Sequence, residues 1–107
     1  MKGIFPMIRH VVMFKFKEEA EGRTKAENIA ITKAMLDALP EKIDWIRAST
    51  VAINSADADQ TNYDLCLISD FDSLEDLAAY IVHPDHKAVS AFMRSVRLDR
   101  ACVDFEI

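Results

Sequence analysis

The run Ile8–Phe16 (IRHVVMFKF) is the feature that most constrains the fold, because it predicts a β-strand with apolar side chains on both faces. Successive residues of a strand point to opposite faces of the sheet. The first face carries His10, Val12, Phe14 and Phe16, and the second carries Val11 and Met13 together with Arg9 and Lys15. A sheet with one face in water alternates apolar with polar residues. This strand therefore needs apolar cover on both sides.

Hydrophobic periodicity in the rest of the chain predicts further strands and helices. Strands are expected over residues 45–54, 63–71 and 97–105, and helices over residues 24–39, 73–81 and 84–96. The order β-α-β-β-α-β is typical of a ferredoxin-like α+β fold, with an antiparallel four-stranded sheet and helices on one face. We expect a single domain over residues 1–107, in which residues 1–6 form an N-terminal extension to a core of residues 7–107. Met7 is an alternative start.

The second face of the sheet needs a separate explanation. Residues 63–71 (YDLCLISDF) are also apolar on both faces, with Leu65, Leu67 and Phe71 on one and Cys66 and Ile68 on the other. Helices on one side leave the opposite side uncovered. The simplest cover is a second copy of the chain in a closed two-fold dimer. The alternative is that these strands are merely rich in hydrophobic residues.

Composition excludes several classes of protein. The chain has 13 basic and 18 acidic residues and a net charge of −5, which argues against nucleic-acid binding. Its apolar runs are far shorter than the roughly 20 residues of a membrane span. The N-terminus lacks a signal-peptide pattern, so a cytoplasmic location is expected. Cys66 and Cys102 each lie in an apolar run, which favours two buried free thiols over a disulfide.

Residues 80–86 (YIVHPDH) place two histidines and a tyrosine around a forced turn. Pro84 lacks an N–H group, disfavours helical geometry at His83 and suits the first position of a new helix. One helix should therefore end near Val82, and the next should begin at Pro84 with His83 as its cap. His86 then lies in the first turn, where free N–H groups and the helix dipole favour a neutral imidazole.

Three segments together form a specific pattern. They are residues 8–17 (IRHVVMFKFK), residues 71–77 (FDSLEDL) leading into residues 80–86, and residues 103–105 (VDF). In this combination the chain resembles the stress-responsive A/B barrel family, also called the dimeric α+β barrel (Dabb) domain. The resemblance implies a ferredoxin-like protomer and a homodimer whose two sheets form a barrel.

The resemblance also points to a site. One plant branch of the family comprises polyketide cyclases that act on small aromatic precursors. Their catalytic tyrosine and histidine match Tyr80 and His86 here, and a histidine on their first strand matches His10. We therefore expect Tyr80 and His86 as catalytic residues and His10, Val12 and Phe14 as ligand-binding residues. The substrate does not carry over, because the rest of the cyclase pocket has no residue-by-residue match.

Each candidate also has a structural reading. His86 could simply stabilise the helix break through a backbone hydrogen bond. Tyr80 could be a ring of the hydrophobic core with its hydroxyl in water. His10 could be a core histidine whose ring nitrogens are hydrogen-bonded within the protein. His83 and His86 are three residues apart, but Pro84 disrupts the helical register between them, so no metal site is expected. Asp104 reads as a loop, cap or solvent-exposed position. No phosphate loop is present, and we expect no cofactor.

Two functional hypotheses remain. In the first, the homodimer binds a small hydrophobic or carbonyl compound, with acid–base chemistry by His86 and Tyr80. In the second, the homodimer is a non-catalytic structural or scaffold protein related to stress. The residues leave open whether the protein is an enzyme. An open, polar-lined cavity would favour the first hypothesis, and a filled core would favour the second.

Overall fold

Four antiparallel strands form the central sheet of the protein. The computed structural model describes residues 6–107, so all of the predicted extension except Pro6 lies outside the described residues. The strands are β1 (Ile8–Phe16), β4 (Ala48–Ile53), β5 (Leu65–Phe71) and β6 (Arg97–Glu106). Their order across the sheet is β4-β5-β1-β6. This arrangement confirms the predicted ferredoxin-like fold, with the predicted first strand in the sheet interior.

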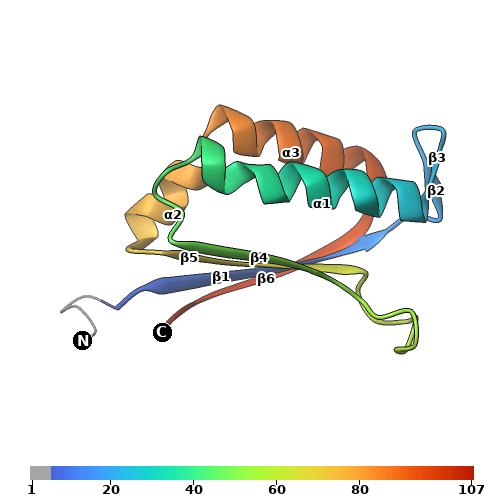
Figure 1. Ribbon diagram of the computed structural model, residues 1–107, viewed down its shortest axis with the longest axis horizontal. Coiled ribbons are helices and arrows are strands. Elements are labelled where there is room, and N and C mark those ends of the chain that lie inside the picture. Colours follow the sequence, from blue (N-terminus) through green and yellow to red (C-terminus); the bar gives the residue numbers. More distant parts are fainter. Residues whose placement is uncertain (1–5) are drawn as a thin grey trace.

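Three helices cover one face of this sheet: α1 (Lys25–Lys42), α2 (Leu74–Ile81) and α3 (Pro84–Val96) (Figure 1). Helix α1 begins with a capping box, in which Thr24 and Glu27 satisfy each other's backbone N–H groups. Ser73 caps α2 by accepting a hydrogen bond from the Asp76 N–H. The core lies between the sheet and the helices. It includes Phe16, Leu36, Ile43, Phe71, Met93 and Val96.

A small hairpin precedes α1 and was not predicted. Strands β2 (Glu19–Ala20) and β3 (Arg23–Thr24) pair through the turn Glu21-Gly22, where φ is 55° and 72°. Positive φ at both central residues is the geometry that two-residue hairpins prefer. Strands of two residues are too short to show a period in the sequence.

The prediction that α1 ends at Leu39 is wrong, because the helix continues through Pro40 to Lys42. Proline removes only one hydrogen bond of the helix, and here it does so in the last turn. The Ile43 N–H still donates to the Leu39 carbonyl at 2.9 Å. Two predicted strands also begin later than expected, at Ala48 and Leu65.

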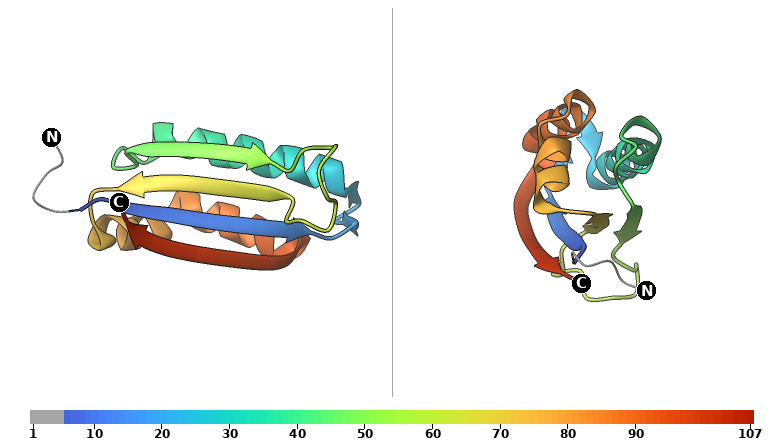
Figure 2. Two further views of the ribbon diagram at one scale, coloured as in Figure 1. Left: turned by 90° about the horizontal axis from the view of Figure 1, so that it is seen from below. Right: turned by 90° about the vertical axis from the view of Figure 1, so that its left-hand side faces the viewer.

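The opposite face of the sheet is open. No element among residues 6–107 covers it, and Figure 2 shows the strands in front with the helices behind. Val11, Met13, Ile68, Val103 and Phe105 share this face, as the strand registers require. Met13, Val103 and Phe105 are 37%, 55% and 42% exposed. We refer to this surface as the open face.

In the described part of the chain, no helix has the length and apolar character needed to cross a membrane.

Replacing Asn28 by alanine should destabilise the protein by about 1–3 kcal/mol. The buried Asn28 side chain accepts a hydrogen bond from Arg23 Nε at 2.7 Å and donates one to the Ala20 carbonyl at 3.1 Å. It thereby joins the hairpin to α1. Urea unfolding measures the change, and Asn62→Ala, at an exposed asparagine, is the control. Equal stabilities of the two variants would contradict this role.

Candidate functional site

A cavity of about 570 Å³ lies between the sheet and helices α2 and α3. Its apolar lining includes Val12, Phe14, Leu36, Leu67, Val89 and Met93. Its polar lining includes His10, Tyr80 and His86. The five site residues expected from the sequence therefore line one cavity, although three of them come from β1 and two from the helices on either side of the break. Their roles in binding or catalysis stay predictions.

His10 reaches the cavity from the sheet interior. It lies on β1 directly opposite Asp104 of β6, and its Nδ1 is 2.5 Å from Asp104 Oδ1. The His10 side chain is 4% exposed, whereas that of Asp104 is 37% exposed. In residues 6–107, every side-chain nitrogen or oxygen that is fully buried has a hydrogen-bond partner. No partner is found for His10 Nε2, so this atom is not fully buried and reaches the surface of the cavity that His10 lines. Asp104 thus orients the ring with Nε2 accessible.

Tyr80 is held rigidly near the end of α2. Its ring is 1% exposed and packs against Phe71 and His86, with centroid distances of 4.9 and 4.5 Å. The His10 ring lies 6.3 Å away on the other side. By the same reasoning as for His10, the hydroxyl has no partner in the described chain and reaches the cavity. Burial raises the pKa of Tyr80, so the hydroxyl stays protonated and can donate a hydrogen bond.

The helix break forms as predicted. Helix α2 ends at Ile81 with Val82 as its C-cap, and Pro84 is the first residue of α3. His83 caps α3, because its Nδ1 accepts a hydrogen bond from the Asp85 N–H at 3.1 Å. The His83 ring also packs edge-on against Trp45 at 5.7 Å. His83 is therefore structural.

His86 lies in the first turn of α3 and lines the cavity. Its Nδ1 is 3.5 Å from the Ser90 hydroxyl. Burial lowers the pKa of His86, and the electrostatic influence of His10, Arg100 and His83 lowers it further, against an opposing hydrogen bond to the Ile81 backbone. A neutral imidazole can accept a proton at neutral pH. The hydrogen bond to Ile81 also leaves open a purely structural role, in which His86 stabilises the helix break.

Arginines surround the polar side of the cavity. Arg94 of α3 and Arg97 and Arg100 of β6 all line it. None of the three forms a salt bridge within residues 6–107. The cavity thus joins an apolar interior to a charged rim, in which these three arginines outnumber one carboxylate, Asp99. No pattern in the sequence marks these residues as part of a site.

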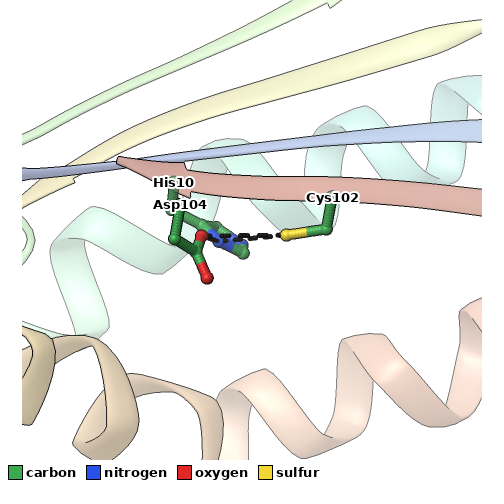
Figure 3. Close-up of side chains that lie close together, drawn as sticks. All are labelled: His10, Cys102 and Asp104. Atoms are coloured by element: carbon green, nitrogen blue, oxygen red, sulfur yellow. Dashed lines mark hydrogen bonds and ion pairs between the residues drawn. The ribbon is translucent and has the colours of Figure 1, made fainter. Parts of the chain in front are cut away.

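Asp104 and Cys102 were also missed. Both belong to β6, an edge strand, and lie on the same face as His10 (Figure 3). Both cysteines are free, as favoured, but the expectation that both are buried is wrong, because Cys66 is half-buried and Cys102 is exposed at the sheet edge. Only the strand register, which pairs residues 94 positions apart, reveals that Asp104 meets His10.

Solved structures with the same fold include two bacterial proteins of unknown function that are described as dimeric. The protein from Bacteroides fragilis NCTC 9343 is 33% identical, with a TM-score of 0.83 and coverage of 94% of this chain and 96% of that one. The protein from Thermobifida fusca YX is 25% identical, with a TM-score of 0.82 and coverage of 100% and 96%.

A hydroxynitrile lyase from Passiflora edulis has a TM-score of 0.76 and coverage of 95% and 94%, but at 13% identity it shows the fold alone. A search of curated proteins found no match. The family profile described as Stress Responsive A/B Barrel Domain (Dabb) matches residues 8–107, nearly the whole chain. Together with the Bacteroides relative, this match establishes that the chain belongs to the stress-responsive A/B barrel (Dabb) family.

Proposed function

We propose that the protein binds a small hydrophobic carbonyl compound in the cavity and transfers a proton to or from it. The observation that carries this proposal is the convergence of His10, Tyr80 and His86 on one apolar cavity of about 570 Å³. A volume of this order suits a small organic ligand, and apolar walls with a few polar groups are typical of ligand sites. A filled core, which the scaffold hypothesis expects, would leave no such space.

The three polar groups have complementary chemistry. Tyr80 is protonated and donates a hydrogen bond to the carbonyl oxygen of the ligand. Neutral His86 removes a proton from the carbon next to that carbonyl. The C–H bond breaks, an N–H bond forms on His86, and the electron pair becomes an enolate whose oxygen is held by Tyr80. His10, oriented by Asp104, offers Nε2 as a second acceptor or donor on the sheet side.

The arginine rim narrows the class of ligand. Arg94, Arg97 and Arg100 lie beside the cavity without salt bridges in the described chain. A guanidinium group favours carboxylates, which it can bind with two hydrogen bonds. We therefore favour a ligand with an apolar or aromatic body, a carbonyl group and an anionic end.

We further propose that the protein is a homodimer joined through the open face. Met13, Val103 and Phe105 expose apolar surface there, and a contiguous apolar patch of this kind marks an interaction site. Two relatives at 33% and 25% identity are described as dimeric. Closed two-fold symmetry lets the same apolar surface of each copy cover the other.

Tyr80→Phe and His86→Asn should abolish the thermal stabilisation that a bound ligand gives to the wild type. Ligand binding raises the unfolding temperature by mass action, so thermal unfolding with a panel of small aromatic keto acids reports occupancy. His83→Asn is the matched control, because His83 does not line the cavity and an asparagine side chain can also cap α3. The control should keep the full ligand shift.

The same experiment distinguishes the ligand-binding proposal from the scaffold hypothesis. If His86 is only a structural fastener, His86→Asn should lower stability by roughly 1–3 kcal/mol through a lost hydrogen bond, and no compound of the panel should shift the wild type. That pair of results would defeat the enzyme interpretation.

Wild-type stability should fall as the pH drops below about 6.5, and the fall should be smaller in His86→Asn. The folded-state pKa of His86 lies below its unfolded value, so between the two values the unfolded chain binds more protons. The contribution of His86 is therefore complete above the unfolded pKa and is lost as the pH falls from that value through the folded pKa. Urea unfolding from pH 8 to pH 5 measures the difference, and parallel profiles would contradict the prediction.

Val103→Asp should convert the dimer into monomers, because it places an unpaired charge in an apolar interface. Sedimentation velocity at micromolar concentration measures the mass. Leu74→Asp is the control, since Leu74 is 63% exposed on α2, away from the open face. A wild-type chain that is a cooperatively folded monomer would refute the proposed assembly.

A further inference from the structure

Three side chains of types that can ligate a metal ion meet at the edge of the sheet. His10 of β1 and Cys102 and Asp104 of β6 bring Nδ1, Sγ and a carboxylate oxygen within 4.8 Å of one another (Figure 3). The strand register causes this, because His10 lies opposite Asp104, and Val12, two residues further along β1, lies opposite Cys102. Imidazole, thiolate and carboxylate are the ligands that zinc takes in proteins.

The separations between the donors resemble those around a tetrahedral ion. Cys102 Sγ lies 3.5 Å from His10 Nδ1 and 3.7 Å from Asp104 Oδ1. Zinc bonds of about 2.0 Å to nitrogen or oxygen and 2.3 Å to sulfur place a sulfur roughly 3.5 Å from a nitrogen or oxygen ligand. Two of the three distances therefore already fit. The third, from His10 Nδ1 to Asp104 Oδ1, is 2.5 Å and must open by about 1 Å.

Asp104 is the ligand that can make this adjustment. Its side chain is 37% exposed on an edge strand, whereas the His10 side chain is 4% exposed and fixed in the core. A rotation of the carboxylate would let the ion take the place of the hydrogen bond between His10 and Asp104. The exposed side of Cys102 and Asp104 gives the ion a path from solvent.

A cysteine nucleophile is a poorer interpretation of the same cluster. In a Cys-His-Asp triad the thiol and the carboxylate contact different nitrogens of the imidazole. Here both contact Nδ1. Convergence on a single point is the geometry of metal ligands.

We propose that His10, Cys102 and Asp104 form a three-ligand site for a divalent ion of the zinc type, with the fourth position open. The proposal goes beyond the carbonyl chemistry above, but it shares His10 with it. A bound ion would compensate the negative charges of the thiolate and the carboxylate. It would occupy Nδ1 and leave Nε2 at the cavity, so the metal would fix the same ring orientation that Asp104 provides without it.

Cobalt(II) is the probe, because a bond between cobalt and a thiolate gives an intense near-ultraviolet absorption band. Titration of the reduced, chelator-treated wild type should produce this band with one equivalent of cobalt per chain, and zinc should displace it. Cys102→Ser should lose the band, and Asp104→Asn should weaken binding at least about tenfold. Cys66→Ser is the matched control, because Cys66 is the other free thiol and lies on the opposite face of the sheet.

The control decides which thiol binds. Loss of the band in Cys66→Ser, its persistence in Cys102→Ser, or the absence of stoichiometric binding in the wild type would each overturn the proposal. Circular dichroism confirms that each variant is folded. Repeating the ligand-shift assay in the presence of chelator separates the two proposals. Ligand shifts without cobalt binding would refute only the metal site. Cobalt binding without any ligand shift would refute only the carbonyl chemistry.

Discussion

The antiparallel register of β1 against β6 is the constraint on which the rest of the structure depends. It places His10 opposite Asp104 and brings Cys102 beside them. A slip of one residue would turn every side chain of one strand to the other face. His10 would then leave the cavity, and Val11 and Met13 would enter the core. The buried even-numbered residues of β1, from Ile8 to Phe16, make such a slip costly because each of them would lose its apolar surroundings.

The helix break supplies the other half of the site. A continuous helix from Leu74 to Val96 could not turn both Tyr80 and His86 toward the same cavity while also packing along the sheet. Pro84 ends the first helix and starts the second, and the His83 side chain satisfies the Asp85 N–H group that this break exposes. The resulting edge-to-face contact of Tyr80 with His86 is therefore a product of backbone geometry as much as of side-chain chemistry.

Local patterns in the sequence were sufficient for much of the fold. The strand Ile8–Phe16, the cap at Ser73 and the break at Pro84 were predicted because each depends on neighbouring residues. His10, Tyr80 and His86 could be identified as a group only through the family resemblance. The contact between His10 and Asp104 could not be predicted, because strand register is a tertiary property that no local period encodes. The two-residue strands β2 and β3 were too short to leave a pattern.

Alternation along β1 divides its residues between two tasks. Even-numbered positions such as Val12 and Phe14 contact the cavity, whereas Val11 and Met13 belong to the open face. A single strand thus serves two surfaces with separate sets of side chains. Under the proposed function and assembly, substitutions at even-numbered positions would change which ligand the cavity accepts without altering the surface through which the sheet associates, and substitutions at odd-numbered positions would do the reverse. Ligand binding and association would then be separately adjustable within nine consecutive residues.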